Sequence, residues 1–244
     1  MKKSSNIQVL AGKKAYSYIQ QHGIQADDIS MLVGASGGPK WFCLFGLDQY
    51  LTSTFFKGRQ TPLELIGSSA GSWRFACYAQ QDAAAASRRF CDAYRTISYP
   101  KGSSIAKVTE ISATVLDAVF PTTGNVQEVI ENPLFRLNFV VARPKRWLHT
   151  EKNLAQLAGL TLAAGANLVH RRSLAAFYER LIFQQQPEQS VFSAIRDLPT
   201  RHIKLSPDNL KQALLASGSI PLVLDPVNYI DGAGDGPFID GGIT

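Results

Sequence analysis

The stretch LELIGSSAGSWRFACYAQ, residues 63–80, joins an apolar segment to a second one through a turn of small residues. Residues 63–67 are typical of a short buried strand, and residues 71–80 predict a helix. The turn between them, Gly67-Ser68-Ser69-Ala70-Gly71, matches the pattern G-x-S-x-G, in which a sharp strand-to-helix turn presents a serine oxygen. The stretch therefore predicts a strand–turn–helix unit of an α/β fold, with Ser69 as the candidate nucleophile.

The alternation of strands and helices continues along the chain. Strands are predicted at residues 28–34, 136–142 and 202–205, with short strand pieces at 229–231 and 237–240. Helices are predicted at residues 39–56, 82–97, 105–120, 152–169, 173–183 and 207–217. This order predicts a mostly parallel sheet with helices on both faces, and no linker or repeat divides it. We expect one α/β domain over residues 1–244.

Composition excludes several classes of protein. The chain has 244 residues, of which 45% are hydrophobic and 18% charged, so it is not a disordered, collagen-like or coiled-coil chain. Its three cysteines lack the spacing of a disulfide framework or zinc cluster, and we expect neither metal nor cofactor. No secretory signal is readable, and the apolar stretch at 154–169 is shorter than the roughly 20 residues of a membrane span. We expect a cytoplasmic protein.

The net charge of +6 is unevenly distributed. Residues 133–172 contain one acid, Glu151, and seven basic residues: Arg136, Arg143, Lys145, Arg146, Lys152, Arg171 and Arg172. Such a stretch predicts peripheral contact with an anionic membrane surface, and a solvated face is the alternative interpretation. We expect no nucleic-acid partner.

A glycine-rich segment, Gly34-Ala35-Ser36-Gly37-Gly38-Pro39-Lys40-Trp41, follows the first predicted strand. It matches neither the P-loop pattern nor the dinucleotide pattern G-x-G-x-x-G, which disfavours a nucleotide site. Backbone N–H groups at the start of a helix stabilise negative charge, so the segment predicts a cradle for an anion.

A serine nucleophile needs a base. The histidines are His22, His149, His170 and His202, and none of them follows the last acid, Asp240. A triad of Ser69, Asp197 and His202 is arithmetically possible, although His202 falls within a predicted strand. Asp240-Gly241-Gly242 places a carboxylate at a strand end, and Asp231-Gly232 is a weaker copy. Either pattern alone is typical of a simple turn.

Together these segments resemble the patatin-like phospholipase family, which combines G-G-x-[RK]-G, G-x-S-x-G and D-G-[GA] in this order. The corresponding segments are Gly37-Gly38-Pro39-Lys40-Trp41, Gly67-Ser68-Ser69-Ala70-Gly71 and Asp240-Gly241-Gly242. Ala216-Ser217-Gly218-Ser219-Ile220-Pro221 is similar to the A-S-x-x-x-P stretch before the aspartate of that family. The resemblance covers about residues 31–244.

The resemblance implies a three-layer α/β/α sandwich and a Ser–Asp dyad. Ser69 would be the nucleophile and Asp240 the base, with Asp231 as the alternative base. The implied activity is that of a serine acyl hydrolase that cleaves phospholipid or acylglycerol esters without a cofactor. Because a free aspartate is a weak base, the dyad requires a desolvated Asp240 with a raised pKa.

The resemblance also implies an oxyanion hole built from the N–H groups of Gly37 and Gly38. Pro39 has no N–H, so Lys40 is the expected third donor. Trp41 stands where the family has a glycine, and we expect it to extend the contact of the following helix with the core or with an acyl chain.

The sequence stops four residues after Asp240, where the domain of the family continues. We therefore expect an incomplete domain, with Asp240 in a terminal segment prone to fraying. Three alternatives remain open: an inactive relative that binds lipid or an anionic membrane, an esterase for soluble esters, and a thioesterase.

Overall fold

The computed structural model describes residues 9–145 and 170–244. A seven-stranded sheet lies at its centre, with the main strand order β1-β2-β3-β4-β5. The strands are β1 (Met31–Gly34), β2 (Leu63–Gly67), β3 (Phe135–Pro144), β4 (Tyr178–Gln184), β5 (Thr200–Lys204), β6 (Val227–Ile230) and β7 (Gly234–Asp240). Along the main path only the β3–β4 pair is antiparallel, and β7 pairs antiparallel with both β3 and β6. The chain has an α/β fold with a mostly parallel central sheet, as the sequence predicts.

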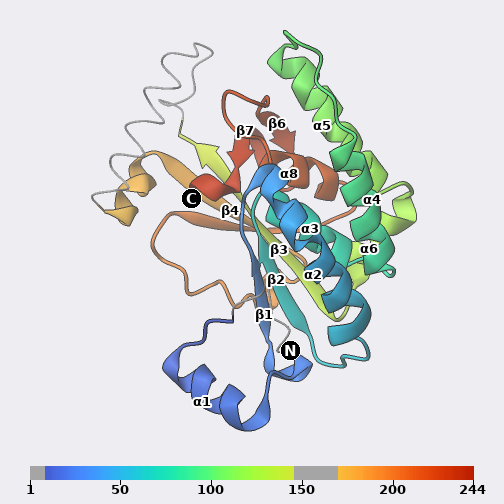
Figure 1. Cartoon of the computed structure of the whole chain (residues 1–244). Helices are drawn as coiled ribbons and strands as arrows, with labels where there is room; N and C mark the ends of the chain where they lie inside the picture. The colour runs from blue at the N-terminus through green and yellow to red at the C-terminus, as the bar shows by residue number, and fades with distance from the viewer. Residues whose placement is uncertain (1–8, 146–169) are drawn as a thin grey trace.

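Helices pack against one face of this sheet (Figure 1). The α-helices are α1 (Lys13–His22), α2 (Phe45–Tyr50), α3 (Ala70–Tyr78), α4 (Ala83–Arg95), α5 (Ile105–Val119), α6 (Thr123–Glu131) and α8 (Leu210–Ser217). One hydrophobic core joins α3, α4, α5, α6 and α8 to β2, β3 and β4. Helix α1 has no buried residue and projects from this body. None of the helices in the described ranges has the length and apolar character needed to cross a membrane.

The opposite face of the sheet is covered differently. A smaller cluster lies there, made of Ala142, Leu174, Tyr178, Leu198 and Ile239. Leu174 belongs to a 3-10 helix, η5 (Arg171–Ala176), and Ile243 of a second 3-10 helix, η7 (Gly241–Ile243), also packs against the cluster. Within residues 9–145 and 170–244 the structure thus establishes two layers, a sheet and one helical layer, and the third layer of the predicted sandwich is not among them.

The helix predicted at residues 173–183 is wrong. Those residues form the end of η5 and most of β4, which pairs with β3 on one edge and β5 on the other. Leu181 and Phe183 face the main core and are fully buried. Pairing on both edges together with this burial outweighs the helix propensity of the leucine, glutamate and arginine residues in the segment.

Several other boundaries differ from the prediction. The segment 39–56 is helical but irregular, because it consists of the 3-10 helix η2 (Gly38–Leu44), α2 and a π-helical turn, η3 (Leu51–Phe55). Helix α8 begins later than predicted, since Ser206 and Asn209 hydrogen-bond each other in the turn before it. Helices α1 and α6 were not predicted, and the helix predicted at 152–169 lies outside the described residues.

A buried ion pair ties α2 to α3. Asp48 of α2 accepts hydrogen bonds from Nε and Nη2 of Arg74 in α3, at 2.8 Å and 2.6 Å. The Tyr78 hydroxyl donates a third bond to this carboxylate at 2.8 Å. Asp48 is 0% exposed and Arg74 is 8% exposed. Because η2 and α2 follow the glycine-rich segment and α3 follows Ser69, this pair links the two segments of the predicted site.

We expect Arg74→Ala to lower the free energy of unfolding by about 3–5 kcal/mol, because it leaves a buried carboxylate without its cation. Urea denaturation measures this loss. Lys107→Ala, which removes the exposed pair with Glu110, is the matched control and should cost far less. Equal losses in the two variants would show that the Asp48–Arg74 pair does not hold the helices together.

Candidate active site

Ser69 lies in a strained turn between β2 and α3. Its backbone has φ 54° and ψ −129°, in a region that non-glycine residues rarely adopt. Such a conformation costs on the order of 1–3 kcal/mol and persists only where the surroundings enforce it. The side chain is buried yet lines a cavity. The turn therefore has the geometry that the G-x-S-x-G pattern predicts.

The glycines of this turn are required by close backbone contacts. A Cβ on Gly71 would lie 2.2 Å from the carbonyl oxygen of Gly34 at the end of β1. A Cβ on Gly67 would lie 2.5 Å from the backbone nitrogen of Ser72. Any side chain at either position would push α3 away from the sheet, so the small residues let the nucleophile turn pack against β1.

Ser217 holds the backbone of Ser69 in place. The N–H of Ser69 donates to Oγ of Ser217 at 3.0 Å, and the hydroxyl of Ser72 donates to the same oxygen at 3.1 Å. Ser217 Oγ in turn donates to the carbonyl oxygen of Val140 in β3 at 2.7 Å. Ser217 is fully buried at the end of α8. Sequence reasoning noted its A-S-x-x-x-P segment but gave this serine no role.

Asp240 is held at the end of β7. It pairs with Val141 of β3, and its N–H donates to the carbonyl of Ser219 at 2.9 Å. Only 6% of the residue is exposed. In the structure β3 and the loop after α8 both hold this segment, and fraying of the segment stays a prediction.

Burial raises the pKa of the Asp240 carboxyl above its ordinary value. Two groups oppose this effect by stabilising the carboxylate: the nearby hydroxyl of Ser69, and the N–H of Gly242, which donates to Oδ1 at 2.7 Å. The carboxyl is therefore desolvated and near the candidate nucleophile, which is what a Ser–Asp dyad requires.

The three glycine-containing segments meet at this point. A Cβ on Gly241 would lie 2.0 Å from the carbonyl oxygen of Val140, so the turn after Asp240 packs directly on β3. A Cβ on Gly242 would lie 2.5 Å from Oγ of Ser36. Ser36 in turn donates to the carbonyl of Ser68 at 3.5 Å. The glycine-rich segment, the nucleophile turn and the aspartate turn are therefore neighbours.

The predicted oxyanion donors differ in availability. The N–H of Lys40 donates to the carbonyl of Gly37 at 3.1 Å, so it is engaged within η2. Gly38 lines the cavity beside Ser69, whereas Gly37 does not. Ala70 lines the cavity too, and sequence reasoning missed it, although the residue after the nucleophile often supplies such a donor. Neither Gly38 nor Ala70 donates its N–H to an acceptor within the described residues.

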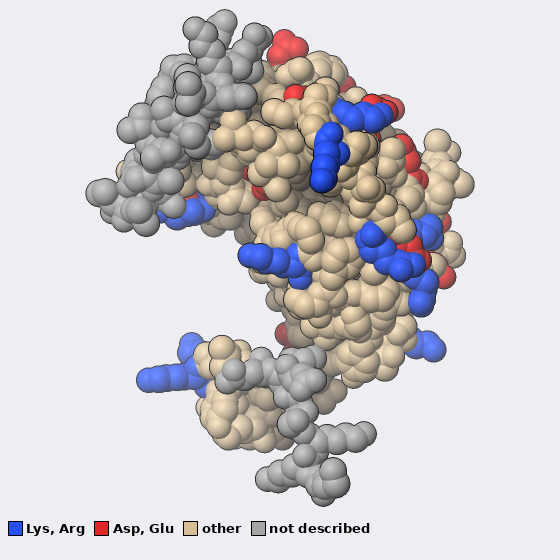
Figure 2. All heavy atoms as spheres, turned by 45° about the horizontal axis from the view of Figure 1, so that its top comes forward, with Lys and Arg blue, Asp and Glu red and all other residues tan. Residues whose placement is uncertain are grey.

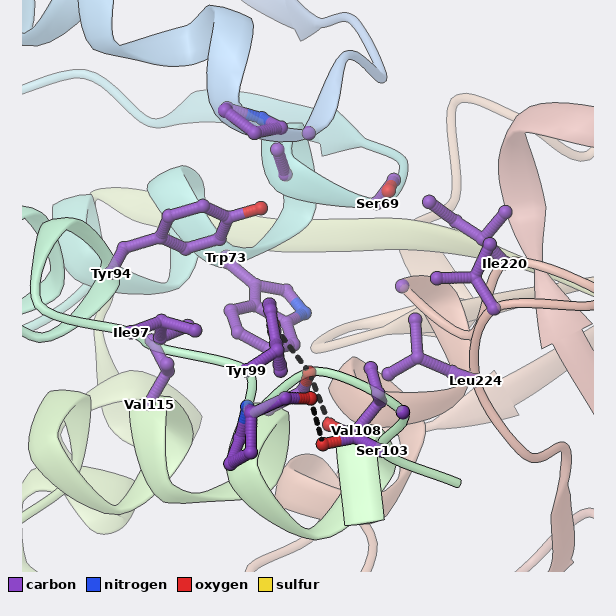
Figure 3. Close-up of a pocket in the computed structure, with 18 residues that line it drawn as sticks. Ser69, Trp73, Tyr94, Ile97, Tyr99, Ser103, Val108, Val115, Ile220 and Leu224 are labelled. Carbon is purple, nitrogen blue, oxygen red and sulfur yellow. Dashed lines mark hydrogen bonds between the residues drawn. The ribbon is translucent and has the colours of Figure 1, made fainter. Parts of the chain in front are cut away.

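A cavity of about 490 Å³ opens at Ser69 (Figure 3). Within the described part of the chain its lining contains no charged residue and no histidine, and consists of Gly38, Pro39, Ser69, Ala70, Trp73, Tyr94, Ile97, Tyr99, Pro100, Gly102, Ser103, Val108, Ser112, Val115, Gly218, Ile220, Val223 and Leu224. The volume is within the usual range for small-molecule sites. Apolar side chains from α3, α5 and the loop after α8 suit the cavity to an apolar group.

Trp41 packs behind this cavity and does not line it. It is 3% exposed and stacks on Phe90, with ring centroids 4.3 Å apart. Phe90 also contacts Trp73, and Trp41 contacts Tyr94 edge to face. Of the two expected roles for Trp41, the structure therefore shows contact with the core, where it supports two side chains of the cavity wall.

The other candidate bases lie elsewhere. Asp231 is exposed, and with His202 it lines a separate pocket beside β5. His202 contacts Gln184 through Nδ1, and burial lowers its pKa. Asp197 is paired with Arg180 and Arg171, mainly Arg180, which lowers its pKa to about 2. The structure brings Asp240, and neither Asp231 nor Asp197 with His202, to Ser69.

The basic residues of the 133–172 stretch are partly paired. Three of those described contact acids from other segments: Arg136 with Glu64, Arg143 with Glu179 and Arg171 with Asp197. Arg146 and Lys152 lie outside the described residues. Figure 2 shows Lys and Arg interspersed with Asp and Glu over the face that it presents. Contact with an anionic membrane stays a prediction.

Comparison of the chain with protein-family models, with curated proteins and with solved structures finds no match.

We expect Ser217→Ala to lower the free energy of unfolding by about 1–3 kcal/mol, because it leaves the N–H of Ser69 and the carbonyl of Val140 without a partner. Urea denaturation measures the loss. The control is Ser219→Ala, which removes only one bond, from Oγ of Ser219 to the Leu215 carbonyl. If the control loses as much, Ser217 has no special role in holding the turn.

The raised pKa of Asp240 predicts two effects of pH. Reaction of Ser69 with a fluorophosphonate should fall as pH decreases through this pKa, at a higher pH than for an ordinary carboxyl, because protonated Asp240 cannot accept a proton. Below the unfolded-state pKa the contribution of Asp240 to stability is fully present, and it is lost as pH rises through the folded-state pKa.

Asp240→Asn should therefore melt at a higher temperature than the unmodified chain at neutral pH, and the difference should disappear in acid. Melting curves over a pH series measure this. Asp231→Asn, at an exposed position away from Ser69, should change neither the melting profile nor the labelling. A melting difference that persists in acid would contradict the conclusion that the buried, charged carboxylate of Asp240 lowers the stability at neutral pH.

Proposed function

We propose that this protein is a serine acyl hydrolase that cleaves carboxylic esters of lipids, phospholipids or acylglycerols. One observation carries the proposal: Ser69, in a strained strand-to-helix turn, lies near the buried carboxyl of Asp240, at the end of a cavity whose described lining is uncharged. Buried titratable groups with perturbed pKa values that line or adjoin a cavity are typical of catalytic sites.

In the proposed reaction, Oγ of Ser69 attacks the ester carbonyl carbon and its proton passes to the Asp240 carboxylate. The carbonyl π electrons move to oxygen, and the N–H groups of Gly38 and Ala70 are the free donors placed to stabilise that oxyanion. When the tetrahedral intermediate collapses, the C–O bond to the leaving group breaks and Asp240 returns the proton to the departing alcohol. Water then cleaves the acyl-enzyme by the same steps.

The proposal extends to the family and its fold. The order of the segments that contain Gly38, Ser69 and Asp240 supports a patatin-like three-layer sandwich, and so does their meeting at one point. Gly37 is a weaker candidate than Gly38 for a donor to the oxyanion, because it does not line the cavity. Lys40 contributes no free backbone donor.

The cavity favours a lipid substrate over a small polar ester. Its side chains offer an acyl chain an apolar environment, whereas a charged headgroup would find no counter-ion among the described residues of the walls. We therefore place the acyl chain inside the cavity and the remainder of the lipid outside it. A cytoplasmic protein in peripheral contact with an anionic membrane through residues 133–172 is consistent with this arrangement.

Labelling with a fluorophosphonate, followed by peptide mapping, tests the proposal. We expect the adduct on Ser69 and at least a 10³-fold loss of labelling in Ser69→Ala, because the variant has no nucleophile. Ser68→Ala is the matched control, since its buried hydroxyl has no hydrogen-bond partner among residues 9–145 and 170–244 and labelling should persist.

A folded chain that is not labelled would instead support an inactive relative that binds lipid. Labelling together with hydrolysis of only short soluble esters or thioesters would support an esterase or a thioesterase.

A further inference from the structure

Tyr94 of α4 places an unpaired phenol hydroxyl in the cavity. Its oxygen makes no hydrogen bond within the described residues, whereas the hydroxyl of Tyr99, in the same cavity, is 3.2 Å from Oγ of Ser112. Figure 3 shows the Tyr94 hydroxyl directed toward the end of the cavity where Ser69 lies. A free donor thus faces the candidate nucleophile.

The same hydroxyl is close to the glycine-rich segment. A Cβ on Gly38 would lie 3.9 Å from the Tyr94 oxygen. Gly38 is one of the two residues whose N–H groups remain free beside Ser69. A carbonyl oxygen bound by Gly38 would therefore have the phenol as its neighbour.

The ring of Tyr94 is fixed in direction by other aromatic rings. It makes edge-to-face contacts with Trp41, Phe42 and Phe90, with ring centroids 6.2 Å, 5.6 Å and 5.7 Å apart. These contacts leave the phenol little freedom to turn away from the cavity. A donor held in this way needs no reorganisation when charge develops on a substrate.

The glycine-rich segment supplies fewer free backbone donors than the resemblance implies, and the Tyr94 hydroxyl can take the place of the missing one. Pro39 has no N–H, and that of Lys40 is bonded to the Gly37 carbonyl. Within the described residues, the free backbone hydrogen-bond donors beside Ser69 are the N–H groups of Gly38 and Ala70. A third donor aimed at the same oxygen would strengthen the stabilisation of a tetrahedral intermediate.

We infer that Tyr94 is a catalytic residue whose hydroxyl donates a hydrogen bond to the oxyanion formed when Ser69 attacks an ester carbonyl. The inference rests on the proposed function. No proton is transferred: the phenol O–H bond stays intact while the carbonyl oxygen gains and then loses its negative charge. Burial raises the pKa of Tyr94, which keeps the phenol protonated and able to donate.

The test compares Tyr94→Phe with Tyr229→Phe in the full chain, with p-nitrophenyl octanoate as substrate. Tyr94→Phe retains the ring contacts and removes only the hydroxyl. We expect kcat to fall about 100-fold with KM unchanged, because the bond forms only in the transition state. Tyr229→Phe should retain kcat, since Tyr229 is 54% exposed on β6 and is not among the residues that line the cavity.

A second measurement separates chemistry from packing. A trifluoromethyl ketone with an octyl chain adds to a serine nucleophile and forms a tetrahedral oxyanion, whereas the corresponding methyl ketone binds largely without this addition. Tyr94→Phe should weaken the fluorinated inhibitor by about the same factor as kcat/KM and leave the methyl ketone unaffected. Equal weakening of both inhibitors would show a structural role and overturn the inference.

The outcomes distinguish the two proposals. If the unmodified chain hydrolyses the ester and is labelled at Ser69, but Tyr94→Phe matches its kcat, the proposed function stands and the role of Tyr94 is refuted. If the folded, unmodified chain neither hydrolyses the ester nor reacts at Ser69, both proposals fail.

Discussion

The hydrogen bond from the N–H of Ser69 to Oγ of Ser217 fixes the conformation on which the candidate site depends. The backbone of Ser69 is strained, and strain persists only where neighbouring groups make every alternative worse. Ser217 does this from a fully buried position, where it also bonds to β3 through Val140. The position of the serine side chain is therefore set by three elements, α3, α8 and β3, rather than by its own turn alone.

The same strand positions the carboxylate. The carbonyl of Val140 accepts a hydrogen bond from the hydroxyl of Ser217, and the next residue, Val141, pairs with Asp240. Because adjacent residues of β3 contact Ser217 and Asp240, the same strand positions both the candidate nucleophile and the candidate base. This placement keeps the Asp240 carboxyl out of water, which raises its pKa and makes it a stronger base, at a cost in stability when the carboxyl is charged.

The sequence predicts those parts of the molecule that depend on local patterns. The strand at the start of 63–71 follows from an apolar run. The turn after it follows from glycines, at whose positions any Cβ atom would collide with backbone. A strand end followed by two glycines favours Asp240 over Asp231, but only the family resemblance implies that Asp240 is a base. Strand β4 could not be predicted, since its residues favour a helix until β3 and β5 are placed beside it. The roles of Ser217 and Ala70 depend on contacts across the fold, for which spacing alone gives no signal.

The bond between Ser69 and Ser217 joins residues 148 positions apart. Contacts of such long sequence separation form late, because the entropy of closing the intervening loop is lost before the contact contributes any stability. In a chain synthesised from its N-terminus, the nucleophile turn emerges long before the residues that hold it. Reactivity of the serine would thus arise as one of the last events of folding, after α8 and β7 have docked on β3.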